Sequence, residues 1–245
     1  ISLSNGAQIS LLSLPPVIPF NWISNKNLFS VIEKLNGFSI SRRIKTALNK
    51  INYRPDVIVN AFNPYFDTTS RKIFEKLPNV YYCYDNIDAT NWAKKHGTRL
   101  EKNVIKTANA VIFSSDALQQ NKEWNKKSFV IRNGVDIKIF EKLSNKACNN
   151  ERKIIGYTGC IDNRLDYNLL EDLITRNPLF DFLFVGPIKD TNAQTLKRFN
   201  NVKFTGPVKP EHLPQAMQQF DAGIIPFVKN DFTRNIYPMK ANEYL

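Results

Sequence analysis

The stretch NDFTRNIYPMKANEYL (230–245) holds residues whose types and spacing suit phosphate and sugar chemistry. Pro238 suits the first turn of a helix, where its missing N–H costs nothing. Lys240 and Glu243 are three residues apart and would share one face of that helix. A cation near a helix N-terminus attracts phosphates, and a carboxylate accepts hydrogen bonds from ribose hydroxyls. The pattern is compatible with part of a nucleotide site, and equally with an exposed ion pair of little energetic weight.

A second candidate lies in IIGYTGCIDNRLDYNLLEDLI (154–174), which has the pattern of a strand, a turn and a helix. Gly156 and Gly159 allow the backbone to bend and a ligand to approach closely. The following helix would offer free N–H groups to an anion, with Arg164 at its start. The segment is neither GxGxxG nor a Walker loop, and an ordinary turn with a solvated arginine fits it equally well.

Two further apolar runs end in Gly-Pro, at FLFVGP (182–187) and VKFTGPV (202–208). Gly-Pro commonly ends a strand without any functional role. The alternative is that Gly186 and Gly206 line the same site as Gly159, from neighbouring strands.

Acidic residues follow another predicted strand, in YDNIDATNW (84–92). Asp85 and Asp88 are the candidates for a catalytic or acceptor-binding carboxylate. Turn and N-cap residues have the same composition, so a structural role is an equal alternative. His96 lies in the polar sequence KKHGT and is expected at the surface rather than in catalysis.

Strands that alternate with helices must position these residues. Short apolar runs rich in β-branched residues recur through the chain and predict strands at 56–61, 79–85, 109–115, 128–133, 153–159, 180–186, 201–206 and 221–227. Helical spacing marks 164–176 and 211–220. This alternation predicts an α/β fold with parallel sheets. The polar stretch 143–153 is interpreted as a linker between domains at 1–148 and 149–245, with ligand binding expected in a cleft between them.

Charge is divided unevenly between these predicted domains. The net charge of the 245-residue chain is +12, and residues 1–148 hold 22 Lys and Arg against 11 Asp and Glu. The first domain is thus suited to an anionic partner. Residues 39–51 place four apolar residues (Ile40, Ile44, Leu48 and Ile51) on one helical face, with Arg42, Arg43, Lys45 and Lys50 around them. This pattern fits a helix at an anionic membrane surface, or equally a helix with a core-facing stripe.

The ending AGIIPFVKNDFTRNIYPMKANEYL resembles the nucleotide-sugar signature of retaining GT-B glycosyltransferases. The resemblance is to glycosyltransferase family 4, in the branch of teichuronic-acid and capsular polysaccharide transferases. GYTGCIDNRLDYNLL, FLFVGP, NVKFTGPV and LPQAMQQFD agree with it in order and spacing. VIFSSDAL and VIRNGVDIKIF resemble the last strands of the first domain in that family. Relative to the family, the chain is truncated at both ends.

The resemblance implies two Rossmann-like domains facing a cleft, with the sugar donor bound by the second domain. Glu243 matches the second carboxylate of the E-x7-E motif, whereas Asn235 stands in place of the first. Gly159 matches the family's glycine, but Cys160 replaces the arginine that usually follows it. Arg164 lies near the family's phosphate-binding lysine. Further donor-site candidates are Gly186, Thr233, Tyr237 and Lys240.

The implied reaction transfers a hexose, with retention, from a nucleoside-diphosphate sugar to a hydroxyl of a glycan or lipid-linked acceptor. No D-x-D occurs in the sequence, so no metal and no cofactor besides the donor substrate are expected. The expected location is cytoplasmic, or peripheral at the inner face of the cell membrane. The alternatives are a nucleotide-sugar epimerase of the same architecture and a basic binding protein without enzymatic activity. No recognisable nucleic-acid-binding motif is present, so a nucleic-acid partner is not expected.

Overall fold

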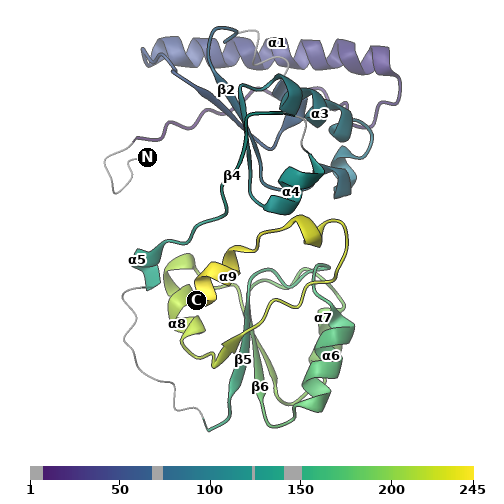
Figure 1. The fold of residues 1–245 in the computed structure, drawn as a ribbon, viewed down its shortest axis with the longest axis vertical. Helices are drawn as coiled ribbons and strands as arrows, with labels where there is room; N and C mark the ends of the chain where they lie inside the picture. Colours follow the sequence, from purple (N-terminus) through teal and green to yellow (C-terminus); the bar gives the residue numbers. More distant parts are fainter. Residues whose placement is uncertain (1–7, 68–73, 123–124, 141–150) are drawn as a thin grey trace. The chain divides into compact units, whose positions relative to one another are not determined.

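The computed structural model describes residues 8–67, 74–122, 125–140 and 151–245 (Figure 1). They divide into two compact units, Ile1–Arg132 and Asn133–Leu245. The first unit is called unit 1 and the second unit 2. Most of the expected linker, including residues 143–150, lies outside the described residues, so the predicted boundary between 148 and 149 stays a prediction.

The sheet of unit 1 has four parallel strands in the order β1-β2-β3-β4. They are β1 (Ile58–Ala61), β2 (Asn79–Cys83), β3 (Ala110–Phe113) and β4 (Ser128–Val130). Each lies within a run expected to form a strand. The central strands β2 and β3 are mostly buried or half-buried, whereas the outer strands β1 and β4 expose Val59 and Phe129.

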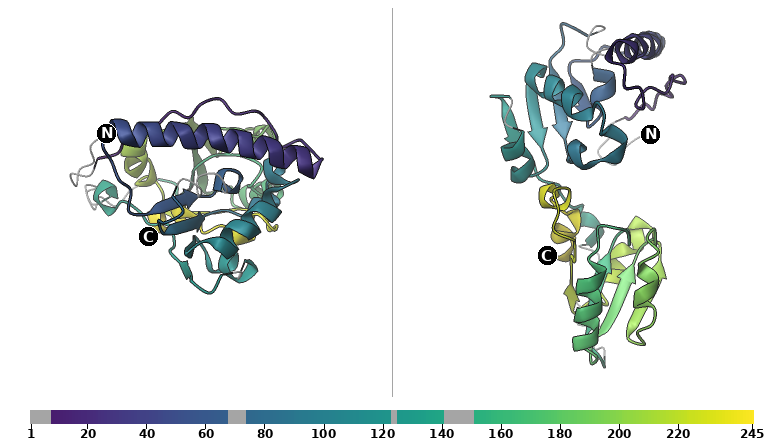
Figure 2. Two further views of the ribbon diagram at one scale, coloured as in Figure 1. Left: turned by 90° about the horizontal axis from the view of Figure 1, so that it is seen from above. Right: turned by 90° about the vertical axis from the view of Figure 1, so that its right-hand side faces the viewer.

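Helices and short 3-10 turns connect these strands. They are α1 (Lys26–Lys50), η1 (Pro64–Phe66), η2 (Ile87–Ala89), η3 (Asn91–Ala93), α3 (Gly97–Thr107) and α4 (Asp116–Asn121). The 25-residue α1 begins thirteen residues before the helix expected at 39–51. Asn25 caps its N-terminus by accepting hydrogen bonds from the backbone of Asn27 and Leu28. α1 runs along the outside of unit 1 (Figure 2).

The apolar stripe expected at a membrane surface faces inward along most of α1. Ile40 is buried, Ile44 and Leu48 are half-buried, and only Ile51 is exposed. The core-facing alternative is therefore the correct one for this stripe. The basic residues around it, Arg42, Arg43, Lys45 and Lys50, are all exposed.

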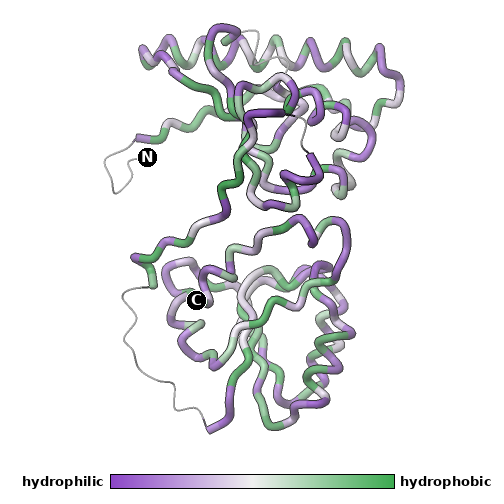
Figure 3. The backbone as a smooth tube through the Cα atoms, viewed as in Figure 1, coloured by the Kyte–Doolittle hydropathy of each residue, from purple (hydrophilic) through white to green (hydrophobic). Residues whose placement is uncertain are grey.

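The sheet of unit 2 also has four parallel strands, in the order β7-β6-β5-β8. They are β5 (Ile154–Thr158), β6 (Asp181–Val185), β7 (Val202–Gly206) and β8 (Ala222–Gly223). The strand expected over 221–227 is reduced to two paired residues, and Pro226, which has no N–H for a ladder, lies just beyond it. These strands are the more hydrophobic parts of the unit 2 trace (Figure 3).

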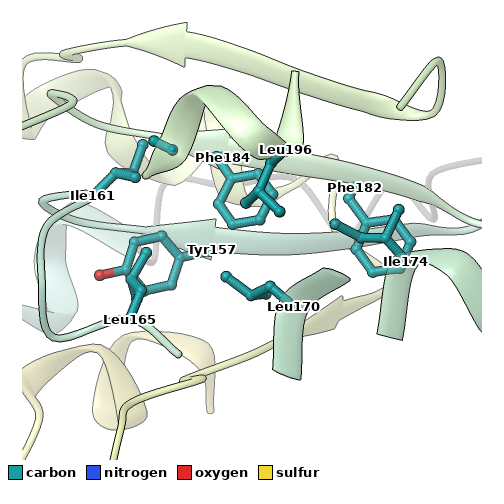
Figure 4. Close-up of a cluster of buried hydrophobic side chains, with 9 residues drawn as sticks. Tyr157, Ile161, Leu165, Leu170, Ile174, Phe182, Phe184 and Leu196 are labelled. Atoms are coloured by element: carbon teal, nitrogen blue, oxygen red, sulfur yellow. The ribbon is translucent and has the colours of Figure 1, made fainter. Parts of the chain in front are cut away.

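The helical elements of unit 2 are α5 (Ile137–Phe140), α6 (Tyr167–Arg176), α7 (Ala193–Leu196), η4 (Pro210–His212), α8 (Leu213–Met217), η5 (Thr233–Asn235) and α9 (Met239–Tyr244). The helix expected at 211–220 is divided into η4 and α8. The core forms where α6 and α7 pack on β5 and β6, through residues that include Leu170, Phe182 and Phe184 (Figure 4). The sequence is therefore read correctly as two α/β units with parallel sheets.

Candidate functional site

Three glycines end neighbouring strands of unit 2. Gly159 and Gly186 follow β5 and β6 with φ angles of 126° and 146°, a region that favours glycine. A Cβ atom on Gly186 would lie 2.0 Å from the carbonyl oxygen of Gly159. The Gly186 amide donates to the Gly206 carbonyl over 2.9 Å. The glycines thus allow the backbone to pack closely at the carboxyl edge of the sheet, where ligands bind in open α/β folds.

The Lys240 side chain reaches back from α9 to the end of β5. Its Nζ donates to the Tyr157 hydroxyl at 3.0 Å and lies 4.3 Å from the centre of the Tyr157 ring. The centre of the Phe227 ring is 4.8 Å away. Burial, reinforced by the nearby Arg164 guanidinium, lowers the pKa of Lys240 to about 8. This amine therefore stays mostly charged at neutral pH but loses its proton around pH 8, where an exposed lysine is still charged.

Arg164 is engaged by a neighbouring carboxylate. Its Nε and Nη2 atoms donate to Asp162 over 2.8 and 2.7 Å, forming a bidentate pair. This pairing holds the pKa of Asp162 below its usual value, against the opposing effect of burial. The guanidinium also lies over Phe227, 5.7 Å from the ring centre. A phosphate approaching Arg164 would meet a pair whose charges already cancel.

The N-terminus of α6 is capped by Asp166, whose carboxylate accepts a hydrogen bond from the Leu169 amide. The sequence led us to expect that the backbone amides at the start of α6 would be free to bind an anion. The Leu169 amide is not free, because it donates to Asp166. An aspartate at this position satisfies a backbone donor and places a negative charge where a phosphate would bind.

Glu243 lies one turn beyond Lys240 on α9 and is half-buried. Among the described residues it has no hydrogen bond or ion pair of its own. Burial raises the pKa of Glu243, and the Lys240 charge partly offsets this effect. A half-buried carboxylate without a donor is suited to accept hydrogen bonds from a ligand, because forming them would relieve the cost of its desolvation.

Tyr244, the next residue, fixes α9 to the sheet. Its hydroxyl accepts a hydrogen bond from the Thr158 amide at 2.9 Å, at the end of β5. Its ring packs on Gly223 so closely that a Cβ there would lie 2.5 Å from a ring carbon. These contacts position Lys240 and Glu243 against the carboxyl edge of the sheet.

The loop before α9 holds the other three predicted donor-site residues in internal hydrogen bonds. The Thr233 hydroxyl donates to the Val228 carbonyl, and Asn235 is buried with its amide donating to Asp231. The Tyr237 hydroxyl donates to Asn242 at 2.8 Å. Their observed contacts stabilise the loop, and their roles toward a donor stay predictions.

In unit 1, Asp88 belongs to a polar network. Its buried members, Glu101 and Lys122, were not predicted from the sequence. Thr98 donates to Asp88 over 2.6 Å, and the Lys122 ammonium lies 3.7 Å from the other carboxylate oxygen. Lys122 also pairs with Glu101, and neither of these side chains is more than 1% exposed. The Tyr81 hydroxyl donates to Glu101 at 2.9 Å. A buried ion pair therefore holds Asp88 in place.

The sequence contained a signal for part of this network. Glu101 lies among the apolar residues of α3, next to Leu100 and three residues before Val104, both buried. A carboxylate inside an apolar helical face requires a partner in the core. Lys122 carried no comparable signal, because lysines outside regular elements are usually exposed.

Asp85 directly follows Tyr84, which belongs to an aromatic group. Asp85 is half-buried, and its carbonyl accepts a weak hydrogen bond from the Cys83 thiol. Next to it, the Tyr84 ring packs 4.5 Å from Phe62, which adopts a φ of 62° that is unusual for a bulky residue. Trp92, 46% exposed, lies against Phe62. Exposed aromatic rings beside carboxylates suit a polar ligand with an apolar face.

His96 is not at the surface, as its polar surroundings in the sequence suggested. It is buried, stacks on Phe29 with 3.9 Å between ring centres, and its Nε2 lies 2.6 Å from the Ile23 carbonyl. These contacts tie the segment before α1 to α3, so His96 has a structural place in unit 1.

Comparison with known proteins gives relatives in sequence and in structure. No family model matches the chain. Over 160 residues the chain is 29% identical to the "Putative teichuronic acid biosynthesis glycosyltransferase TuaH" of Bacillus subtilis (strain 168). The alignment covers 59% of this chain and 40% of that protein, so the chain spans well under half of its relative. The predicted resemblance to the teichuronic-acid branch is confirmed.

The structural relatives are glycosyltransferases. Sucrose-phosphate synthase from Thermosynechococcus elongatus matches with a TM-score of 0.64 and 17% identity, over 95% of this chain and 63% of that one. HepE from Anabaena, solved with UDP, matches with a TM-score of 0.58 and 18% identity, over 82% and 58% of the two chains. The fold is thus the GT-B fold, of which the chain spans a part.

Proposed function

We propose that this chain is part of a glycosyltransferase that moves a hexose from a nucleoside-diphosphate sugar to an acceptor hydroxyl in cell-surface polysaccharide or glycolipid synthesis. The observation that carries the proposal is the placement of Lys240 against Gly159 at the carboxyl edge of the unit 2 sheet, with Glu243 one turn further along the same helix. The sequence similarity to a teichuronic acid glycosyltransferase supports the same activity.

In the proposed donor complex, Gly159 leaves room for the diphosphate, Gly186 lets the ends of β5 and β6 approach closely, and Glu243 accepts hydrogen bonds from the ribose hydroxyls. The structural relative HepE has been solved with UDP-glucose, which makes UDP the first nucleotide to test. The donor is the only small molecule required, and no cofactor takes part. Catalysis rests on stabilising the phosphate charge that develops as the glycosidic bond breaks.

The acceptor site is proposed in unit 1, with Asp85 and Asp88 as catalytic or acceptor-binding carboxylates. The ion pair that holds Asp88 and the exposed Trp92 ring support this assignment. A sugar ring can pack its apolar face on an aromatic ring while its hydroxyls donate to carboxylates. The sugar is transferred with retention, and NMR of the product linkage measures the anomeric configuration directly.

Peripheral binding to the cytoplasmic face of an anionic membrane is part of the proposal, through α1. No described helix combines the length and apolar character needed to span a bilayer. The outward side of α1 exposes an apolar stripe formed by Leu28, Val31, Leu35 and Phe38.

Arg42 and Lys45 continue this stripe toward the C-terminus of α1. A groove of about 360 Å³ beside it is lined by Pro15, Phe38, Ser39, Arg42, Arg43 and Thr46. Apolar residues followed by exposed arginines suit a bilayer with anionic headgroups.

Ligand-induced thermal stabilisation of the full-length protein tests the proposed function. UDP or UDP-glucose should raise the melting temperature, with a shift that grows with ligand concentration. Transfer of radiolabelled sugar from UDP-glucose to a lipid extract should then follow. Stabilisation by DNA alone, with steep salt dependence, would instead identify a basic nucleic-acid-binding protein. Interconversion of free UDP-sugars without transfer would identify an epimerase.

A further inference from the structure

The Lys240 ammonium is an unusual cation because no carboxylate balances it. Among the described residues none of the Asp or Glu oxygens lies within ion-pair distance of its Nζ, and its hydrogen bond goes to the neutral Tyr157 hydroxyl. Two aromatic rings enclose it, with centres 4.3 and 4.8 Å away. A half-buried ammonium in such surroundings is costly to charge unless an anion approaches.

The other cation at this end of the sheet is differently placed. Arg164 donates from Nε and Nη2 to the Asp162 carboxylate, so its charge is already balanced, although the N–H groups of Nη1 lie outside this pair. Binding a phosphate through the remaining N–H groups would bring the phosphate close to the Asp162 carboxylate. An anion that binds at this end of the sheet is therefore stabilised more by Lys240 than by Arg164.

The space next to the Lys240 amine is kept open by a glycine. A Cβ on Gly159 would lie 2.9 Å from Nζ, so only a residue without a side chain leaves the amine accessible there. The positive φ of Gly159 independently favours glycine. A small anion can therefore contact the Gly159 backbone and the Lys240 amine at the same time.

We propose that Lys240, rather than Arg164, is the cation that binds the donor diphosphate, and that its amine takes up a proton from solvent as the diphosphate binds. This inference rests on the proposed function and deepens it, because it assigns the charge at the donor site to one side chain. The proton adds to the Nζ lone pair, which produces the ammonium that faces the bound phosphates.

The charged and titratable groups near the amine make the proton uptake assignable to Lys240. The group itself has a pKa lowered to about 8, and the ligand's negative charge would raise this pKa again. Burial raises the pKa of both Tyr157 and Cys160, which favours the protonated forms of these two groups between pH 8 and 9. Glu243 is ionised in that range despite its raised pKa, and the Asp162–Arg164 pair keeps both its charges.

The test is calorimetry of UDP binding to the full-length protein at pH 8.5–9.0, in buffers of different ionisation enthalpy. The diphosphate of UDP is fully ionised there, since the second pKa of a phosphate is about 6. The uracil N3–H begins to lose its proton at the upper end of this range, equally in UDP and in uridine. We expect UDP to take up about 0.5–1 proton more than uridine, which has the same base and no phosphate. UDP affinity should fall with pH above 8, by up to about tenfold per unit.

Lys240→Arg is the matched variant, because arginine keeps its charge throughout this pH range. It should bind UDP with the same proton uptake as uridine, and its affinity for UDP should fall less between pH 8 and 9 than that of the unaltered protein. UDP binding by the unaltered protein with no proton uptake, or with the same uptake for UDP and uridine, would overturn the inference and leave the proposed function in place. Absence of binding by UDP, GDP and ADP alike would overturn both. The comparison of UDP with uridine needs no variant and decides the question even where Lys240→Arg fails to fold.

Discussion

The Tyr244 hydroxyl accepts a hydrogen bond from the Thr158 amide at 2.9 Å and so joins α9 to the end of β5. This contact connects residues 86 positions apart in the sequence. Lys240 and Glu243 lie on the same short helix, so the contact of Lys240 with Gly159 and the position of Glu243 both depend on how α9 is held. The hydroxyl group of a residue outside the predicted site therefore supports the geometry of that site.

Tyr244→Phe should weaken UDP binding and lower stability together. The Thr158 amide would lose its partner, and an unsatisfied backbone donor in a partly buried place costs about 1–3 kcal/mol. Denaturant unfolding measures the stability change, and calorimetry measures the affinity. Tyr53→Phe, which removes a hydroxyl from an exposed tyrosine of unit 1, is the control and should change neither. Unaltered UDP affinity in Tyr244→Phe would show that the hydroxyl does not position α9.

Glu243→Ala should reduce the affinity for UDP by about 1–3 kcal/mol, the range for hydrogen bonds that involve a charged group. The proposed partners are the ribose hydroxyls, so 2′,3′-dideoxy-UDP should bind equally to both proteins. Calorimetry of both ligands with both proteins makes the comparison. The two proteins should differ in their affinity for UDP and agree in their affinity for the dideoxy ligand. Equal loss of affinity for both ligands would indicate general damage to α9 instead of a lost ribose contact.

Lys122→Met should destabilise unit 1 strongly, because it leaves Glu101 buried without its cation. Removing one partner of a buried ion pair typically costs about 3–5 kcal/mol. The double variant Lys122→Met with Glu101→Leu should recover much of this loss, since no buried charge remains unpaired. Urea unfolding of the two variants gives the comparison. A double variant less stable than Lys122→Met alone would contradict the interpretation of this pair.

Sugar transfer should persist in the presence of EDTA. The expectation comes from the absence of D-x-D in the sequence and from the positive charge that Lys240 brings to the proposed diphosphate site. The rate of product formation is measured with and without chelator, and after addition of Mg²⁺ or Mn²⁺. Loss of activity that either metal restores would show that a metal ion bridges the diphosphate.

Binding to phosphatidylglycerol vesicles should weaken sharply as salt rises, because each basic residue near an anionic surface contributes about 1 kcal/mol within a Debye length. Replacing Arg42, Arg43, Lys45 and Lys50 by Gln should weaken binding further without unfolding the protein. The matched control removes four exposed charges from unit 2, at Lys197, Arg198, Lys203 and Lys209. Co-sedimentation measures both proteins. Protein that stays in the supernatant at low salt would favour a soluble acceptor.

The sequence by itself determined the order and type of the elements. Each of the eight predicted strands is present, because apolar runs rich in β-branched residues, such as IIGYT (154–158), have few alternatives in an α/β chain. It also indicated that Gly159 and Gly186 end neighbouring strands, since the carboxyl ends of parallel strands share an edge. Local pattern was sufficient for these features because they depend on periodicity and on backbone freedom.

Only the tertiary structure decided the partners of the charged residues. Nothing in the spacing of Arg164 showed that Asp162 would hold it, or that Lys240 would reach Tyr157 across 83 positions of sequence. The inward stripe of α1 and the burial of Glu101 with Lys122 were likewise settled by packing. Burial and charge pairing are properties of surfaces brought together by the fold, and a linear pattern does not specify which side chain meets which.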